Sequence, residues 1–212
     1  MNTPTRIMAL ISGGGRTALN ILDAIAQGEL NAKLELAIAS RPDAAGVERL
    51  KRRGVPCRVV NQKDFRSDAG TDWRAMSATI NELIQTRHPD LVILAGYMCL
   101  YYPPAGYEGR VMNIHPALIP AFCGRGMYGH HVHEAVVARG VKVSGCTVHF
   151  VDGEYDHGPI IVQRACPVYD TDTPDDVAER VFAEECRAYP EAIRLFSEGR
   201  LSIRDGRVCI AQ

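Results

Sequence analysis

The chain has 212 residues, of which 46% are hydrophobic and 23% are charged, and its formal net charge is −1. Such values belong to an ordinary globular protein that is long enough to bury a substantial core. No basic block predicts nucleic-acid binding, and no apolar run approaches the ~18 residues that a membrane span needs. Seven cysteines without a CxxC pair favour reduced thiols in a cytoplasmic protein, and the polar segment 1–6 is not expected to be a signal peptide.

Strand and helix signals alternate through the first half of the chain. Strands are expected at 7–11, 34–39, 57–60 and 91–95, and helices at 17–28, 44–53 and 71–86. Gly28 and Gly54 stand at the ends of two of these helices, where glycine commonly stops a helix. The alternation predicts an α/β fold with a Rossmann-like, mostly parallel sheet flanked by helices on both faces.

The second half has a different pattern. A strand is expected at 111–114, a loop rich in Pro and Gly at 117–130, a short helix at 132–139, and strands at 146–151 and 160–167. A long helical stretch at 175–198 is expected to be interrupted at Pro190. Without a repeat or a linker, we expect a single domain over 1–212. Its two halves, about 1–100 and 101–212, are expected to share one sheet.

A glycine-rich turn follows the first expected strand. Ser12 and Gly13-Gly14-Gly15 lead into Arg16 and Thr17 at the start of the first helix. Backbone N–H groups of such a turn and of a helix N-terminus suit a phosphate at the carboxyl end of a parallel strand. The turn matches neither GxGxxG nor GxxxxGK[ST], so neither a dinucleotide nor a nucleoside triphosphate is indicated. A plain tight turn is the alternative interpretation.

Three polar side chains lie at expected strand ends. Asn113 and His115 alternate with Ile114, so they face the same side of their strand, and Asp156 follows a later strand. An amide can stabilise an oxyanion, an imidazole can carry a proton, and a carboxylate can orient the imidazole. These groups suit the attack of an amine on a carbonyl-type carbon. The alternatives are a buried core histidine and a solvated acidic turn.

We expect no metal site. His130, His131 and His133 could suggest zinc, but no cysteine or carboxylate stands at a supporting spacing. The acidic loop that holds Asp152, Glu154 and Asp156 lacks the twelve-residue pattern of an EF-hand.

Five segments carry a resemblance to a known family. They are Ile11-Ser12-Gly13-Gly14-Gly15, Leu94-Ala95-Gly96-Tyr97-Met98, Asn113-Ile114-His115-Pro116-Ala117-Leu118-Ile119-Pro120, Val143-Ser144-Gly145-Cys146-Thr147-Val148-His149-Phe150-Val151 and Asp156-His157-Gly158-Pro159-Ile160-Ile161. In order and spacing they resemble the folate-dependent formyltransferases, and among these the phosphoribosylglycinamide formyltransferases (glycinamide ribonucleotide transformylases). The resemblance covers nearly the whole chain and implies the formyltransferase fold.

The resemblance implies a role for each matching position. Asn113, His115 and Asp156 match the catalytic trio, and Glu185 matches a carboxylate near the glycinamide end of the substrate. The substrate phosphate would be held by Gly13, Gly14, Gly15, Arg16 and Thr17. The folate pterin would be wrapped by two segments, Met98, Cys99, Leu100 and Tyr101 in one and Asp152, Gly153, Glu154 and Tyr155 in the other.

The chain departs from the family pattern at several positions. Thr17 replaces an asparagine that is common in the loop, and Cys99 stands where many members have arginine, which bears on pterin packing. The segment 122–129 is longer than the loop that the family leads us to expect before His133. Arg74 is a candidate for the arginine that some members use against the folate.

The implied reaction transfers a formyl group from 10-formyltetrahydrofolate, a co-substrate, to the amine of 5-phosphoribosylglycinamide in purine (IMP) biosynthesis. Its partners would be small molecules, with no nucleic acid, membrane or metal, in a monomer or homodimer. Alternatives are a formyltetrahydrofolate hydrolase or a sugar-nucleotide formyltransferase of the same fold, or a non-catalytic folate-binding protein. Methionyl-tRNA formyltransferase and the hydrolase usually carry a further domain, for which we expect no room in 212 residues.

Overall fold

The computed structural model describes residues 3–211. The chain divides into two compact units, Met1–Met112 with Val151–Glu154, and Asn113–Phe150 with Tyr155–Gln212. Each unit is described by itself below.

The first unit is built on parallel strands. They are β1 (Thr5–Ile11), β2 (Ala32–Ala39), β3 (Cys57–Val59) and β6 (Leu91–Leu94), and β1 pairs in parallel with both β2 and β6. All four residues of β6 and nearly all of β1 are buried, as expected for strands covered on both faces.

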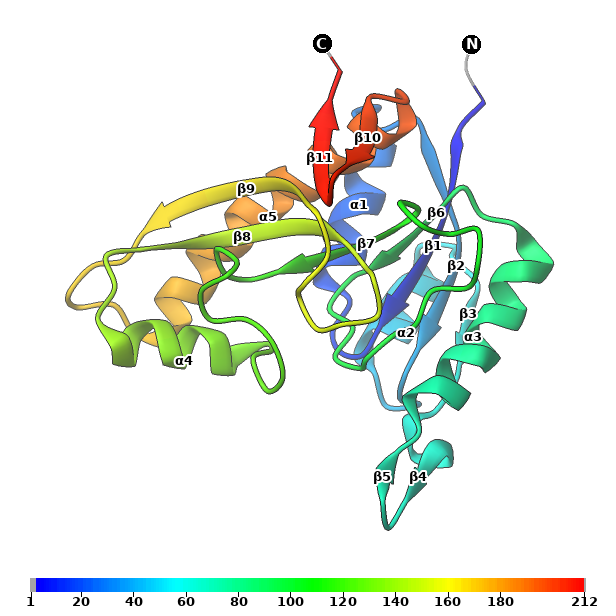
Figure 1. Cartoon of the computed structure of the whole chain (residues 1–212), viewed down its shortest axis with the longest axis horizontal. Helices are drawn as coiled ribbons and strands as arrows, with labels where there is room; N and C mark the ends of the chain where they lie inside the picture. The colour runs from blue at the N-terminus through cyan, green and yellow to red at the C-terminus, as the bar shows by residue number, and fades with distance from the viewer. Residues whose placement is uncertain (1–2, 212) are drawn as a thin grey trace. The chain divides into compact units, whose positions relative to one another are not determined.

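Three α-helices connect these strands: α1 (Arg16–Ala26), α2 (Ala45–Arg52) and α3 (Trp73–Arg87). Met8, Leu36, Met76 and Ile80 belong to one buried apolar cluster that joins the sheet to α3. A 3₁₀ helix, Gln62–Phe65, and a small hairpin of β4 (Arg66–Ser67) and β5 (Gly70–Thr71) precede α3, and the hairpin projects beyond its lower end in Figure 1.

The second unit pairs its strands antiparallel. Strand β7 (Val111–His115) enters it at Asn113, and β8 (Val143–Phe150) pairs antiparallel with β9 (Ile160–Pro167). Helices α4 (His130–Arg139) and α5 (Pro174–Ser197) complete it, and α5 runs along β8 and β9 (Figure 1). The strand order is β3-β2-β1-β6-β7-β8-β9, and this confirms the predicted mostly parallel sheet flanked by helices.

Two features of the chain's end differ from expectation. Helix α5 is continuous through Pro190, so the predicted interruption is wrong. Its apolar face, which includes Val181, Tyr189 and Ile193, is buried, and this burial outweighs the hydrogen bond that proline cannot make.

The sequence analysis also missed a hairpin after α5. Strands β10 (Leu201–Arg204) and β11 (Arg207–Ile210) pair antiparallel around Asp205-Gly206, the Asp-Gly turn that favours hairpins.

Candidate functional site

The carboxyl end of β7 brings two of the predicted site residues together. Asn113 is half-buried and His115 is 3% exposed, whereas Ile114 between them points to the opposite face. One carboxylate faces both side chains: Asp156 Oδ2 lies 3.4 Å from His115 Nδ1, and Asp156 Oδ1 lies 3.4 Å from Asn113 Nδ2. The structure therefore brings Asp156 to Asn113 and His115, which stand 43 and 41 residues before it in the sequence.

The backbone of Asp156 has an unusual conformation. Its φ is 52°, in the left-handed region that asparagine and aspartate tolerate better than most residues. This conformation aims the carboxylate inward, where its side chain is 10% exposed. Its Oδ2 also accepts a hydrogen bond from the backbone N–H of Gly124 at 2.9 Å. Asp156 thus ties the loop after β8 to the long loop after β7.

Both ring nitrogens of His115 face acceptors. Nε2 donates to the carbonyl oxygen of Phe122 at 2.8 Å, because a carbonyl can only accept, and Nδ1 faces Asp156. A doubly protonated imidazole satisfies both contacts at once. The site is therefore shaped for a charged imidazolium beside a carboxylate.

Sequence reasoning gave no role to His149, which lies against Asn113. The ring of His149 is 1% exposed, and its Nε2 lies 3.1 Å from Asn113 Nδ2 and 3.9 Å from Asp156 Oδ1. The sequence did carry a signal of these contacts. His149 is a polar residue in the buried stretch of β8, and buried polar groups need hydrogen-bond partners.

A second buried polar residue of β8 holds the start of the loop after β7. Thr147 is fully buried, donates to the carbonyl oxygen of Ala117 at 2.7 Å and accepts from the N–H of Ile119 at 3.1 Å. Gln163 of β9 bonds both Thr147 and Ile119 at 3.0 Å. These contacts give the loop a fixed starting point beside His115.

The glycine-rich turn of the first unit is held by close backbone contact. Gly46 N donates to Gly13 O at 3.0 Å, and a Cβ on Gly15 would stand 3.0 Å from Gly46 Cα. Gly15, at φ 70°, caps α1 without a side-chain hydrogen bond, and no acidic residue lies in the first turn. The helix N-terminus can therefore receive an anion. Sequence reasoning missed Gly46, whose lack of a side chain permits this contact.

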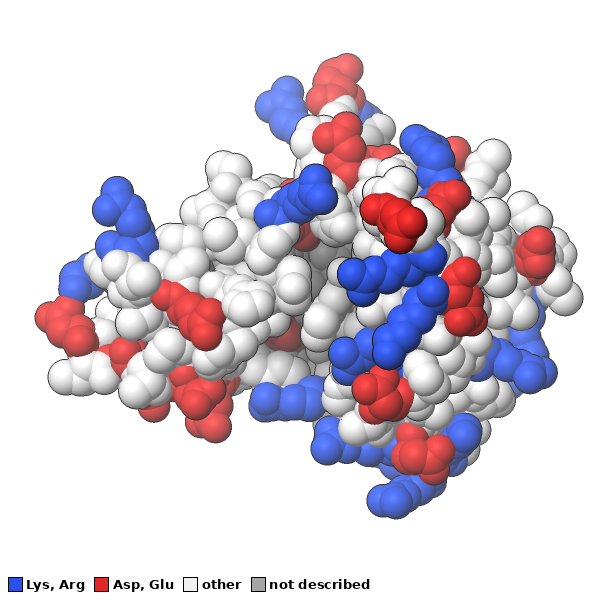
Figure 2. Space-filling view, turned by 90° about the horizontal axis from the view of Figure 1, so that it is seen from below, with Lys and Arg blue, Asp and Glu red and all other residues white. Residues whose placement is uncertain are grey.

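Basic side chains gather on one face of the first unit. In Figure 1, β1 points downward, so Figure 2, seen from below, looks onto the carboxyl ends of the parallel strands of this unit. Lys and Arg side chains are prominent there, with carboxylates between them. Arg49 of α2 donates to the carbonyl oxygen of Gly14 at 3.1 Å, which brings one positive charge to the turn itself.

The segment from Met98 to Tyr101 alternates between exposed and buried side chains. Met98 is 44% exposed, and its N–H donates to Ser12 Oγ at 2.9 Å. Cys99 is buried and its thiol donates to Gln62 Oε1 at 3.1 Å, while burial raises the pKa of that thiol. Tyr101 is buried and donates to Asn81 Oδ1 at 2.6 Å. A ligand beside this segment would meet Met98 and Leu100 rather than the side chains of Cys99 and Tyr101.

The acidic loop contributes to both units. Asp152, Gly153 and Glu154 belong to the first unit, where Asp152 and Glu154 are exposed. Tyr155 belongs to the second. In the first unit, the candidate Arg74 lies with its guanidinium 4.2 Å from the centre of the Tyr102 ring.

Glu185 lies on α5 in the second unit and is half-buried. Burial, followed by the nearby charge of Glu185, raises the pKa of the Cys146 thiol to about 12. Such a thiol is not a nucleophile at neutral pH.

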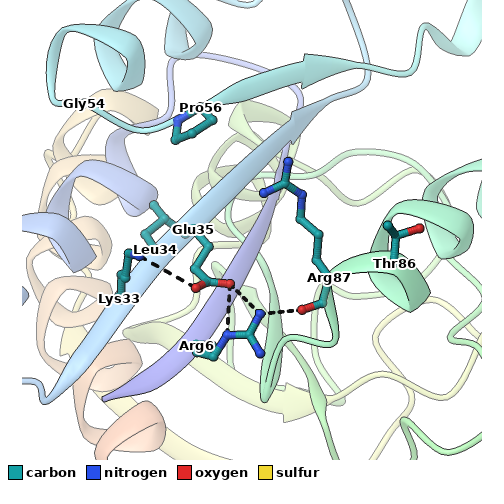
Figure 3. A pocket seen from close by; sticks show the side chains of 8 residues that line it. All are labelled: Arg6, Lys33, Leu34, Glu35, Gly54, Pro56, Thr86 and Arg87. Atoms are coloured by element: carbon teal, nitrogen blue, oxygen red, sulfur yellow. Dashed lines mark hydrogen bonds and ion pairs between the residues drawn. The ribbon is translucent and has the colours of Figure 1, made fainter. Parts of the chain in front are cut away.

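A cavity of about 530 Å³ lies at the other end of the first unit, where β1 and β2 begin. Figure 3 shows that Arg6 and Lys33 both reach Glu35, and Arg6 Nη2 lies 2.9 Å from Glu35 Oε2. Hydrogen bonding to Arg6 holds the pKa of Glu35 below its ordinary value. None of the predicted site residues lines this cavity, so we do not place the site there.

Within the described part of the chain, no group of three or more His, Cys, Asp or Glu side chains is placed to hold a metal ion. No helix among residues 3–211 is long and apolar enough to cross a membrane.

The whole chain is similar to formyltransferases. A family model described as formyl transferase matches residues 5–193. The chain is 34% identical over 202 residues to phosphoribosylglycinamide formyltransferase of Haemophilus influenzae, which covers 94% of this chain and 91% of that protein. It is also 34% identical over 207 residues to the trifunctional purine biosynthetic protein adenosine-3 of Bos taurus, which covers 96% of this chain but 20% of that protein. The chain thus spans about a fifth of the length of this relative.

A solved structure shows the same similarity. The crystal structure of glycinamide ribonucleotide transformylase 1 from Symbiobacterium toebii matches with a TM-score of 0.88 and 42% identity, over 100% of this chain and 96% of that one.

Proposed function

We propose a reaction for this chain from one premise: it belongs to the formyl transferase family. The reaction transfers the formyl group of 10-formyltetrahydrofolate to the amine of 5-phosphoribosylglycinamide, a step of de novo purine (IMP) biosynthesis. The observation that carries the proposal is the cluster of Asn113, His115 and Asp156 at the end of β7. Amide, imidazole and carboxylate are the groups that an acyl transfer to an amine needs.

The amine nitrogen attacks the formyl carbon, and the formyl oxygen becomes an oxyanion. Asn113 Nδ2 and an N–H of the His115 imidazolium donate to this oxygen. A new C–N bond forms, the bond from the formyl carbon to N10 of the folate breaks, and one proton moves from the amine to N10. The reaction needs neither a metal nor a covalent enzyme intermediate.

Asp156 holds the His115 ring in place during this sequence and stabilises the positive charge of the imidazolium. Its Oδ2 lies 3.4 Å from the ring, and both side chains are nearly buried, so the attraction is weakly screened. We also assign to this carboxylate a water that carries the proton between the two nitrogens. In this structure Phe122 O accepts the Nε2 hydrogen, so this contact must break if the same hydrogen is donated to the oxyanion.

The two ends of the substrates are assigned to separate segments. The substrate phosphate is held by the turn of Gly13, Gly14 and Gly15 with the N-terminus of α1, at Arg16 and Thr17. Backbone N–H groups and nearby basic side chains support this assignment. Glu185 is assigned to the amine end of the ribonucleotide, where a carboxylate attracts an ammonium group.

The pterin of the folate is assigned to the segments 98–101 and 152–155. Met98 and Leu100 supply apolar contact from the first segment, because the side chains of Cys99 and Tyr101 are buried in the unit.

The partners of the proposed enzyme are small molecules. We propose that the enzyme is cytoplasmic, since all seven cysteines are free thiols, and that it acts as a monomer or homodimer.

One assay tests the proposed reaction. The purified chain is mixed with 10-formyltetrahydrofolate with and without 5-phosphoribosylglycinamide, and both loss of the folate formyl group and formylation of the amine are measured. We expect folate turnover only with the amine and one formylated product per formyl lost. Equal turnover without the amine would identify a hydrolase, and formylation of an amino-sugar nucleotide in preference to the ribonucleotide would identify a different transferase. Asp156→Asn serves as the inactive control.

A further inference from the structure

The protonation state of His149 follows from one hydrogen-bond contact at each ring nitrogen. Nδ1 lies 2.7 Å from the carbonyl oxygen of Phe150, which can only accept, so Nδ1 carries a hydrogen. Nε2 lies 3.1 Å from Asn113 Nδ2, and an amide nitrogen can only donate, so Nε2 carries none. His149 is therefore a neutral ring protonated on Nδ1.

Asp156 determines independently which way the Asn113 amide points, because an ionised carboxylate oxygen can only accept and Oδ1 faces Nδ2. His149 Nε2 and Asp156 Oδ1 both accept, and both face Nδ2 of Asn113, at 3.1 and 3.4 Å. With the amide turned over, its oxygen would meet the bare nitrogen and the carboxylate instead. One amide hydrogen is thus held by His149. The other makes only a long contact with Asp156 and remains available to a stronger acceptor.

The backbone fixes the ring that makes this contact. The register of β8 with β9 shifts between Val148 and His149, where Val148 pairs with Val162 and His149 pairs with Ile160. Such a bulge re-aims the side chain next to it. Burial of the ring and the bond to Phe150 hold it in the new direction.

We propose that His149 is a positioning residue for formyl transfer, a role that rests on the function proposed above. Its bare Nε2 holds the Asn113 amide with the nitrogen toward the reacting carbon. An oxyanion then meets an N–H donor rather than the amide oxygen, which would repel it. Asp156 is a charged group that faces His149, and a neutral His149 ring leaves the charge of Asp156 to His115.

The first test needs no catalysis. Nitrogen-15 NMR of the ligand-free protein at about pH 7.5, with His149→Gln for assignment, reports which ring nitrogens of His149 carry a proton. We expect a neutral ring with its proton on Nδ1. A proton on Nε2, or on both nitrogens, overturns the proposal whatever reaction the chain performs.

The second test is a double-mutant cycle. His149→Phe keeps a flat ring and removes the acceptor, and we expect kcat to fall by about 10- to 100-fold with KM for both substrates little changed. His149→Gln offers an oxygen near the position of Nε2 and should recover part of the loss. In an Asn113→Ala background, either change at His149 should lower kcat by less than about threefold. His131→Phe, at an exposed position on α4, is the matched control.

The cycle separates positioning from general stability. A structural role alone would lower kcat equally with and without the Asn113 amide, and that outcome would overturn the proposal. If His149→Phe fails to fold, the effect of His149→Gln on kcat is compared with Asn113 present and in the Asn113→Ala background. That comparison still tests whether His149 acts through the Asn113 amide. If the chain formylates no ribonucleotide, the cycle is measured on folate deformylation, so failure of the proposed substrate and failure of this proposal remain distinct.

Discussion

Asp156→Asn is the sharpest perturbation of the proposed site because it removes a charge and little else. Asparagine tolerates the left-handed backbone of this position, at φ 52°, as well as aspartate does. The oxygen of the new amide can still accept from Gly124 N. The carboxylate charge beside the His115 ring is lost.

The expected fall in kcat of Asp156→Asn follows from the distance between the Asp156 carboxylate and the His115 ring. Unit charges 3.4 Å apart attract by about 5 kcal/mol at an effective dielectric constant of about 20. This energy limits the loss of rate to between three and four powers of ten, since about 1.4 kcal/mol of activation free energy changes a rate tenfold. We expect kcat to fall by about 10² to 10³, which is within this limit and within the usual range for proton-transfer and oxyanion groups. KM for the ribonucleotide should change little, because the phosphate is assigned to backbone N–H groups of the glycine-rich turn, which this substitution leaves unchanged.

The assay is steady-state formyl transfer at saturating concentrations of both substrates. Asp205→Asn is the matched control, since Asp205 also has a left-handed backbone, at φ 50°, and lies in the exposed turn of the β10–β11 hairpin. His115→Ala should be as severe as Asp156→Asn, and the double variant far less than multiplicatively worse. If Asp156→Asn stays within about threefold of Asp205→Asn, the acidic loop is a solvated turn and the reasoning fails.

Three further outcomes are expected. In Gly46→Ala, the new Cβ would stand 2.9 Å from Gly13 O, so the glycine-rich turn must shift. KM for the ribonucleotide should then rise about tenfold. An equal rise of KM for the folate, in a variant that is still folded, would contradict the assignment of the phosphate to this turn. Burial lowers the pKa of His133 to about 4, so protonation favours the unfolded chain and stability falls as pH drops from 6.5 towards 4. In urea titrations, the free energy of unfolding of His133→Phe should therefore rise by about 2 kcal/mol relative to that of wild type when the pH is lowered from 7.5 to 5. No such rise would show that the His133 ring is protonated as easily in the folded protein as in the unfolded chain. Alkylating the exposed Cys209 should leave activity intact, with buried Cys146 unmodified by mass spectrometry; inactivation that follows modification of Cys209 would argue against a noncovalent mechanism.

Local patterns in the sequence were enough to predict most of the strands and which side chains of the proposed site share a face. Alternation along 111–115 put Asn113 and His115 on one side and Ile114 on the other, because the side-chain period of a strand is two. Strand–helix alternation predicted the parallel strands of the first unit for the same local reason. The hairpin after α5 carried an equally local signal, its Asp-Gly turn, which was overlooked.

Contacts between distant residues were decided only by the tertiary structure. The continuity of α5 through Pro190 depends on what its apolar face buries, and the shape of the glycine-rich turn depends on Gly46. Asp156 reaches His115 through a left-handed backbone that no local pattern requires. His149 reaches Asn113 through a register shift between two strands. Local periodicity determines which face a side chain takes, but the partner on that face is set by how separate strands and loops are brought together.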